Sequence, residues 1–376
     1  GDVYKRQLLT YRKSLLIADQ KEYIASITGL ILNVVSYLAI ILLVTWEQNY
    51  LLALGIGTVT EVVLNIWISW YVEQKYPFLR QRRKEKSTSS LTKRIVRDLK
   101  SLFISRISEK MLYCTDNLII SGFIGVGTVG RYANYCMIAQ AINNILTILA
   151  NTIQPTVGDY FTEKNRQRNY EILRQLTFGF FCIASVVSVG LFSLITPFVR
   201  DIWLGPSYEL GWGITVFCIV VLLVRIMGLP LSLVMGVTGL FEKEKNVGAS
   251  SALLNLIVSL ALVKPYGMAG VLLGTLLSYL LQILYRYIIY FRDFLEMPGE
   301  ALRYAQDIGE YLAVIAGEVL LMQKIVPLIY GAGGMLLFCV CFLLCIAIPL
   351  LLDLVIFGRG WRLQSIVTMV KGMRKA

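Results

Sequence analysis

Ten long apolar runs constrain this chain of 376 residues more than any other feature. Each is close to the roughly 20 residues that an α-helix needs to cross a hydrocarbon core of about 30 Å. The runs cover residues 26–45, 51–72, 101–123, 132–157, 176–199, 211–235, 247–263, 268–289, 308–329 and 335–357. Stretches such as "FGFFCIASVVSVGLFSLI" lack the alternation of a barrel strand. Because only helices and closed barrels satisfy the backbone in lipid, we predict an all-α polytopic membrane helix bundle with about ten transmembrane helices.

The composition agrees with a membrane location. Hydrophobic residues make up 56% of the chain and charged residues 16%, whereas soluble domains are typically about 45–50% apolar and about 25% charged. A soluble protein of this composition would have too little polar surface to stay dispersed.

The distribution of Lys and Arg predicts the orientation. With ten spans, one set of connections, which includes both ends of the chain, holds 29 of the 36 basic residues, and the opposite set holds only Arg131, Arg200 and Lys264. Cytoplasmic loops carry the excess of Lys and Arg, so both ends and the basic loop 73–100 are expected in the cytoplasm. The net charge of +12 is then mostly an orientation signal. The basic stretch "RQRRKEKSTSSLTKR" contains no aromatic platform, and no nucleic-acid partner is expected.

Three glycines in "GFIGVGTVGRY" match the dinucleotide fingerprint G-x-G-x-x-G at Gly125, Gly127 and Gly130. That fingerprint requires a preceding strand and an acidic residue about 20 positions later. Here a helix-length apolar run precedes it, and Ala150 is the residue 20 positions after Gly130. We therefore interpret the glycines as a tight outer turn between the third and fourth spans, where positive φ is needed.

Several enzyme classes are excluded. The chain has no His, which rules out His-based zinc sites and His-dependent triads. Its seven Cys lie in or near the spans without a C-x-x-C pair, and we expect no disulfide framework. No catalytic residue, metal site or cofactor is expected.

Charged and polar side chains interrupt the third span and form a stripe on one side of a helix. At steps of three and four residues it carries Arg106, Glu109, Lys110, Tyr113, Asp116 and Asn117. An unpaired charge at mid-bilayer costs about 2.5–3.5 kcal/mol on insertion scales, so these charges need a reason.

Three interpretations of the stripes remain open. Polar residues in the second, fourth and seventh spans, among them Asn143 and Asn144, can form hydrogen bonds between helices. Arg106 and Lys110 can extend to the cytoplasmic interface. We favour a third interpretation, in which the stripes face a shared hydrated cavity that opens inward and is cationic on balance. Gly270, Gly274 and Ser278 predict a packing seam in the eighth span.

The order of several segments resembles a known family. They are "LLIADQKEYI" (15–24), "TDNLIISGFIGVGTVGRYANY" (115–135), "WLGPSYELG" (203–211), "GLFEKEK" (239–245) and "NLIVSLALVKPYGMAGVLLGT" (255–275). Together they resemble the Wzx-type polysaccharide flippases of the MOP superfamily, which are related to multidrug extruders and lipid II flippases.

This resemblance implies a MATE-like architecture of two six-helix bundles, with about four spans expected before the start of this chain. Residues 1–72 would be the remaining part of the N-terminal bundle, and residues 73–100 a cytoplasmic linker. Residues 101–290 would form the C-terminal bundle, and residues 291–376 two additional helices and a basic tail. The resemblance also implies a bacterial cytoplasmic membrane location and an undecaprenyl-pyrophosphate-linked oligosaccharide as substrate, with other polysaccharide-assembly proteins as possible partners.

A charged headgroup crossing the membrane needs fixed positive charge to offset its lost hydration. We predict that the pyrophosphate is bound by Arg106, Lys110 and Arg225, because the guanidinium fork matches phosphate oxygens. Candidates for contact with the sugars are Tyr113, Asn117, Tyr135, Asn143 and Asn144. Candidates for binding a coupling ion are Asp116, Glu61 and Glu109. Rocking of the bundles would give alternating access.

Two other functions are considered. A cation-coupled multidrug exporter of the same fold would need acidic and aromatic cavity residues, whereas this chain has cations within its spans. A membrane glycan polymerase or ligase would usually carry a large outer loop with catalytic residues. The outer connections here are short, and the longest, around "DIWLGPSYELG", has no evident nucleophile–base pair.

Overall fold

The computed structural model describes residue 16 and residues 21–47, 50–76, 114–161, 165–331 and 333–358. These residues are almost entirely helical and include no strand. The chain forms two compact units, Gly1–Thr92 and Lys93–Ala376. The division of the chain into four parts from the sequence stays a prediction.

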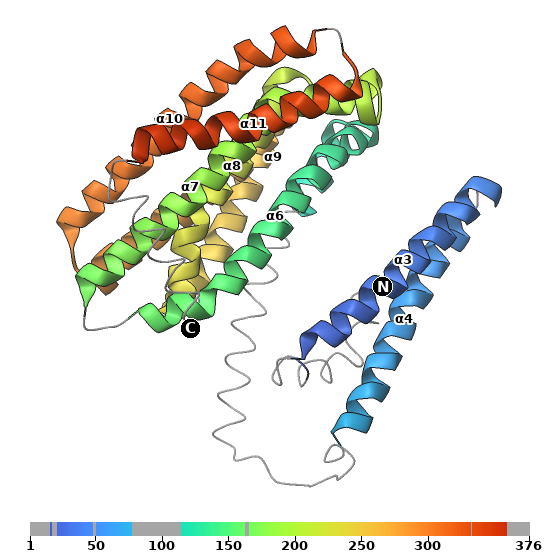
Figure 1. Cartoon of the computed structure of the whole chain (residues 1–376), viewed down its shortest axis with the longest axis horizontal. Helices are drawn as coiled ribbons and strands as arrows, with labels where there is room; N and C mark the ends of the chain where they lie inside the picture. Colours follow the sequence, from blue (N-terminus) through green and yellow to red (C-terminus); the bar gives the residue numbers. More distant parts are fainter. Residues whose placement is uncertain are drawn as a thin grey trace. The chain divides into compact units, whose positions relative to one another are not determined.

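A helical hairpin makes up the described part of the first unit. It consists of α3 (Glu22–Glu47) and α4 (Tyr50–Lys75), which contact each other along their length (Figure 1). The hydroxyl of Thr60 on α4 lies 3.0 Å from that of Ser36 on α3, to which it donates a hydrogen bond. Leu38 and Leu42 are among many large apolar side chains left exposed. Such outward apolar faces are expected of helices in contact with lipid.

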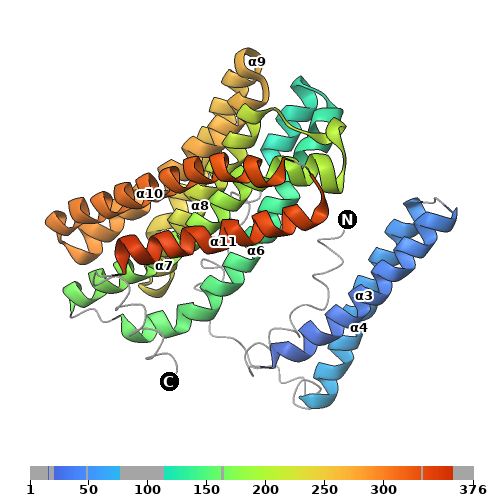
Figure 2. The ribbon, with the colours of Figure 1, turned by 45° about the horizontal axis from the view of Figure 1, so that its top comes forward.

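The second unit is a bundle of longer helices. In chain order these are α6 (Val126–Tyr160), α7 (Arg166–Pro197), α8 (Trp212–Val237), α9 (Phe241–Ile288), α10 (Pro298–Tyr330) and α11 (Met335–Phe357). Before them, residues 114–123 are helical, and three short helical segments, Phe198–Trp203, Pro206–Tyr208 and Ile289–Leu295, connect the long helices. Helix α8 contacts α6, α7 and α9, while α10 and α11 both contact α7 (Figure 2).

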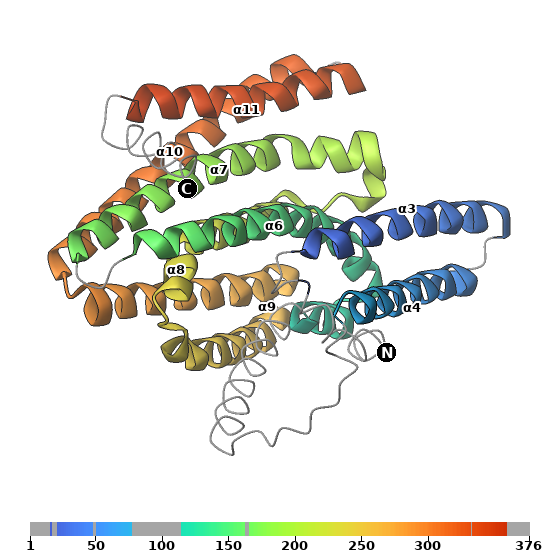
Figure 3. The same cartoon turned by 60° about the horizontal axis from the view of Figure 1, so that its bottom comes forward.

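Helix α9 is a hairpin of two membrane-length helices. Its 48 residues would extend about 70 Å if straight, more than twice the hydrocarbon thickness. At Gly267 the φ angle is 58°, and there the chain reverses. Hydrogen bonds join the segments before and after this reversal. The Ser259 hydroxyl donates to the Val271 carbonyl at 3.2 Å, and Asn255 Nδ2 donates to Thr275 Oγ1 at 2.8 Å. The two halves therefore lie side by side and antiparallel (Figure 3).

The small residues predicted to form a packing seam lie between these two halves. A Cβ on Gly270 would collide with the Leu262 carbonyl, and one on Gly274 with the Ser259 hydroxyl. The seam is therefore confirmed, because only hydrogen at these positions allows the backbones to approach so closely.

The span count agrees with the expectation of about ten. Eight helices in the described parts are long and apolar enough to cross a membrane. Helix α9 is counted once among them although it contains two of the expected spans, and only the end of the third span, 114–123, is described. All seven Cys lie in described segments, and none forms a disulfide.

The turn before α6 differs from the prediction. Gly125 has a φ of 125° and precedes α6, as expected of a turn glycine. Gly127 and Gly130 instead lie within α6, and Arg131 lies in that helix and not in an outer connection. The helix begins about six residues earlier than the apolar run suggested, because a spanning helix extends past the purely apolar segment at its ends.

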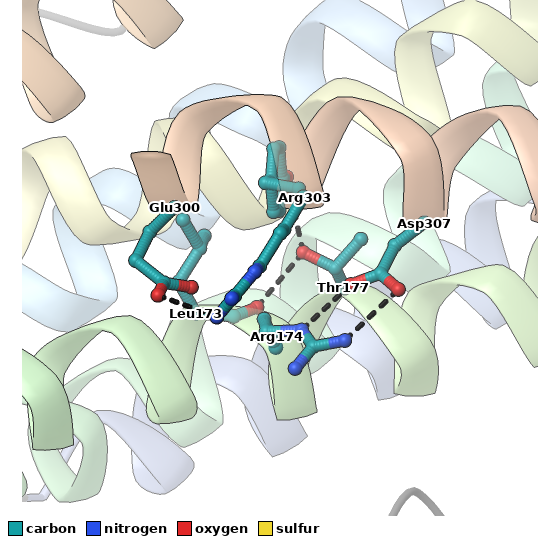
Figure 4. Close-up of polar contacts among 7 residues, drawn as sticks. Leu173, Arg174, Thr177, Glu300, Arg303 and Asp307 are labelled. Atoms are coloured by element: carbon teal, nitrogen blue, oxygen red, sulfur yellow. Dashed lines mark hydrogen bonds and ion pairs between the residues drawn. The ribbon is translucent and has the colours of Figure 1, made fainter. Parts of the chain in front are cut away.

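Polar contacts fix α10 on α7. Arg174 Nε and Nη2 donate to the two carboxylate oxygens of Asp307, at 2.6 and 2.9 Å (Figure 4). One turn along, the hydroxyls of Thr177 and Tyr304 lie 3.1 Å apart. Further along, an aromatic cluster of Phe178, Phe181, Tyr311 and Phe357 joins α7, α10 and α11.

Candidate substrate cavity

A polar cavity of about 400 Å³ lies between α6, α8 and α9. Two arginines, Arg225 from α8 and Arg286 from the second half of α9, line it. Its other polar lining residues are Asn143, Thr147, Asn151, Gln154, Ser232, Tyr279 and Gln282. Among the described residues around this cavity none is acidic, so its wall is cationic.

Helical spacing places these side chains together. On α6 the lining positions Asn143, Thr147, Asn151 and Gln154 step by four, four and three residues, which is one helix face. On α9, Tyr279, Gln282 and Arg286 step by three and four, and so share a face as well. The cavity lies where these polar faces meet α8.

The two arginines occupy different depths. Arg225 lies near the middle of α8, about 20 Å along the helix from Trp212. Its guanidinium carbon lies 5.7 Å from the centre of the Tyr279 ring, a cation–π arrangement. Arg286 lies near the end of α9, at Ile288. Pro230 lies in α8 one turn beyond Arg225, and it has no N–H for the carbonyl of Ile226.

A second cavity of about 320 Å³ shares Arg225 and Tyr279 with the first. It is more apolar than the first cavity. Its polar lining residues include Asp116, Asn117, Tyr132, Tyr135, Gln140 and Thr275. The wall of this cavity therefore contains one carboxylate and one guanidinium, together with three tyrosines.

Asp116 belongs to a buried polar cluster with both halves of α9. Its Oδ2 accepts from the Thr275 hydroxyl at 2.7 Å, and its Oδ1 lies 3.4 Å from Asn255 Nδ2. Asp116 and Asn255 are 4% and 0% exposed. In the described part of the chain, Asn255 Oδ1 has no hydrogen-bond partner. The Asp116 carboxylate therefore accepts from one hydroxyl and faces one amide nitrogen, and Asn255 Oδ1 is an unsatisfied acceptor in the same cluster.

The structure brings together some of the residues proposed from the sequence. Arg225 and Asn143 line the larger cavity, and Asn117 and Tyr135 line the smaller one. Tyr135 also has a structural contact, because its hydroxyl accepts from the Leu210 amide at 3.2 Å.

Other candidates lie elsewhere. Asn144 is exposed, lines neither of these cavities and accepts a hydrogen bond from Gln140 at 2.9 Å. Glu61 is half-buried on α4 in the first unit. Four further candidates lie outside the described residues, namely Arg106, Glu109, Lys110 and Tyr113.

Arg286 is the principal cavity residue that was not among the candidates predicted from the sequence. Its place at the end of an apolar run made it look like an orientation signal. Its spacing from Thr275, Tyr279 and Gln282, in steps of four, three and four, is the signal that could have revealed it.

Fold and cavity together define a class, that of multi-pass helical membrane proteins with a cationic cavity inside a bundle. Residues 7–161, less than half of the chain, match the family described as polysaccharide biosynthesis protein. No curated protein matches the chain. Among solved structures, the lipid II flippase MurJ in an inward-closed conformation matches with a TM-score of 0.66 at 15% identity, over 95% of this chain and 72% of MurJ.

The family match covers only residues 7–161, and the structural match extends over most of the chain. At this level of identity the structural match establishes the fold. The matched structure is that of a flippase.

Proposed function

We propose that the protein flips an undecaprenyl-pyrophosphate-linked oligosaccharide across the bacterial cytoplasmic membrane for surface polysaccharide synthesis. Transport proceeds by alternating access through the cationic cavity, with both ends of this chain in the cytoplasm. The name of the matching family and the flippase fold support this proposal.

The convergence of Arg225 and Arg286 on one polar cavity within the membrane-spanning bundle carries the proposal. Arg225 lies near the middle of α8, where charge is costly, and Arg286 adds a second guanidinium from near the end of α9. A pyrophosphate suits this pair, since each guanidinium can donate two parallel hydrogen bonds to phosphate oxygens. The lipid tail can remain in the bilayer while the headgroup enters the cavity.

The remaining polar lining suits a glycan. Asn143, Asn151, Gln154 and Gln282 offer amide donors and acceptors for sugar hydroxyls, and Tyr279 offers an aromatic face. Arg106, Lys110 and Tyr113 are retained as proposed headgroup contacts, although they lie outside the described residues.

The cluster around Asp116 is proposed to bind a coupling cation. The Asp116 carboxylate would hold the cation, with the Thr275 hydroxyl beside it. Because the carboxylate shares the smaller cavity with Arg225, the presence of a cation there would change the electrostatic field at the headgroup site.

The test is headgroup transport by the full-length protein in a strain that lacks its own flippase, with surface glycan as the readout. Arg225→Ala is expected to abolish surface glycan at unchanged protein level. Arg131→Ala is the matched control, because Arg131 is exposed on α6 and lines neither cavity. Full surface glycan with Arg225→Ala would contradict the assignment.

Export of small organic cations is a second candidate function. The observation that favours it is the smaller cavity, with one carboxylate and three tyrosines. The discriminating measurement is resistance of expressing cells to lipophilic cations. Resistance that depends on Asp116 but not on Arg286, without any rescue of surface glycan, would favour this second function.

A further inference from the structure

Two buried acidic side chains lie away from both cavities. Glu318 on α10 and Asp353 on α11 are each 3% exposed, and both lie in membrane-length helices. Neither lines the cavities described above, and neither takes part in the proposed headgroup or coupling-ion sites.

Helix register brings the two carboxyl groups to one level of α7. Contacts from α7 to α10 advance in the same direction along both helices, from Arg174–Asp307 to Ser185–Glu318, so these helices run parallel. The rings of Phe181 and Phe357 lie 5.5 Å apart. Because α10 and α11 form a hairpin, α11 runs antiparallel to α7. Asp353 lies one turn before Phe357 on α11, and Ser185 lies one turn after Phe181 on α7. The antiparallel register therefore places Asp353 opposite Ser185.

Unsatisfied oxygen atoms are concentrated at this level. The Ser185 hydroxyl donates to Glu318 Oε2 at 2.5 Å. Within the described segments, no partner exists for Glu318 Oε1, for either carboxylate oxygen of Asp353, or for the hydroxyl of Ser188, three residues along α7 from Ser185. Ser188 is 1% exposed. A buried polar atom without a hydrogen bond costs about 1–3 kcal/mol in protein mutational data, so four at one level call for a ligand.

The chemistry of these atoms calls for a positively charged ligand. The carboxyl groups of Glu318 and Asp353 are close enough to interact electrostatically, and in the described chain no Lys or Arg pairs with either. Two like charges so deeply buried cannot both persist without a proton or a counter-ion. The four unpartnered atoms are all oxygen, which suits a hard cation, and the Cys182 thiol lies close enough to interact with both carboxyl groups.

We propose that Glu318, Asp353, Ser185 and Ser188 form a binding site for one monovalent cation, a proton or a sodium ion, which holds α10 and α11 against α7. This site is separate from the cluster around Asp116. Its occupation adjusts the packing of the last two helices independently of the headgroup cavity.

The experiment compares the Tm of the full chain in detergent with and without sodium, at constant ionic strength with choline chloride, over a range of pH. The proteins are the wild type, Asp116→Asn, Glu318→Gln, Asp353→Asn and the control Glu310→Gln, an exposed acid on the same helix. Infrared spectra of the wild type and Asp116→Asn record the carbonyl band of a protonated carboxyl group.

Each arm has a defined outcome. A saturable rise of Tm with sodium that persists in Asp116→Asn and Glu310→Gln, and is lost in Asp353→Asn and Glu318→Gln, identifies a sodium site. A Tm insensitive to sodium, with a protonated-carboxyl band that persists in Asp116→Asn, identifies a proton site. If Asp353→Asn does not fold, the proposal is decided by the sodium effect on Tm and the protonated-carboxyl band of the Asp116→Asn protein alone. Absence of both signals from Asp116→Asn, or equal signals in the wild type and Asp353→Asn, overturns the proposal.

Discussion

At the scale of single residues, buried charge is what distinguishes this bundle from inert membrane packing. Arg225 was recognisable in the sequence because a charge in the middle of an apolar run has few structural uses. Arg286 was not, because the same residue type at the end of a run is the ordinary cytoplasmic flank. The contacts of Asp116 with Asn255 and Thr275, 139 and 159 residues away, leave no local trace in the sequence.

Arg286 provides a test of the phosphate geometry. Arg286→Ala is expected to lower flipping of a pyrophosphate lipid at least tenfold, the equivalent of about 1.4 kcal/mol, since a hydrogen bond to a charged group contributes about 1.5–3 kcal/mol. Arg286→Lys should recover only part of the rate, because the charge remains and the planar fork does not. The measurement is lipid flipping in proteoliposomes. Equal rates for Lys and Arg would show that only charge matters at this position.

Asp116 provides a test of ion coupling. Asp116→Asn keeps the shape of the side chain and removes its charge, so transport driven by an imposed sodium or proton gradient should fall to the rate seen without a gradient. The control is Asn144→Ala, which changes a polar residue that lines neither cavity. A gradient response retained in Asp116→Asn would place the coupling ion elsewhere.

At the scale of helices, hydropathy predicted the elements well because membrane thickness fixes their length. The glycine turn before α6 was the exception. Small residues are compatible with both turns and membrane helices, and only Gly125 among the three has a backbone that requires glycine. The pairing of α10 with α7 also had no sequence signal, since Arg174 and Asp307 lie 133 residues apart.

The seam inside α9 predicts a large effect from one methyl group. Gly274→Ala should lower Tm, because its Cβ would collide with Ser259 and overpacking costs about 1–3 kcal/mol. Gly179→Ala on α7 is the matched control, because nothing lies within 4 Å of an added Cβ there. Alanine at that site should be neutral or stabilise the helix by up to about 1 kcal/mol. Equal Tm values for the two variants would contradict the close approach of the α9 halves.

The ion pair between α7 and α10 predicts different losses of stability for two arginine variants (Figure 4). Arg174→Ala removes two hydrogen bonds from the buried Asp307 carboxylate, and the expected loss is about 1.5–3 kcal/mol of stability. Arg303→Ala breaks a pair with Glu300 that includes an exposed guanidinium, at a cost of at most about 0.5 kcal/mol. Thermal unfolding in detergent should therefore separate the two variants. A double-mutant cycle with Asp307→Asn that gives no coupling would refute the contribution of this pair.

At the scale of the whole molecule, the sequence indicated a multi-pass helical bundle and a flippase-like fold, and both are confirmed. Of the properties of the cavity, only its positive charge could be predicted from the sequence. Its walls come from α6, α8 and both halves of α9, and their assembly depends on packing between segments distant in the chain.

Orientation in the membrane stays a prediction and can be measured directly. The basic loop 73–100, which lies largely outside the described residues, is expected in the cytoplasm. A cysteine at Ser89 should therefore resist an impermeant thiol reagent in intact cells and react after permeabilisation. The background protein for this experiment has its exposed cysteines, Cys114 and Cys339, replaced by Ser. Ready labelling of intact cells would reverse the assigned topology.

Pro230 has a mechanical consequence for transport. Because Pro230 has no N–H to donate to the Ile226 carbonyl, α8 lacks one backbone hydrogen bond about one turn from Arg225 and bends more easily there. In the proposed function, bending at this point would let the cavity widen around a bulky headgroup and narrow again afterwards, while the ends of α8 keep their packing. A flippase built in this way would accept headgroups of different size with the same charged contacts.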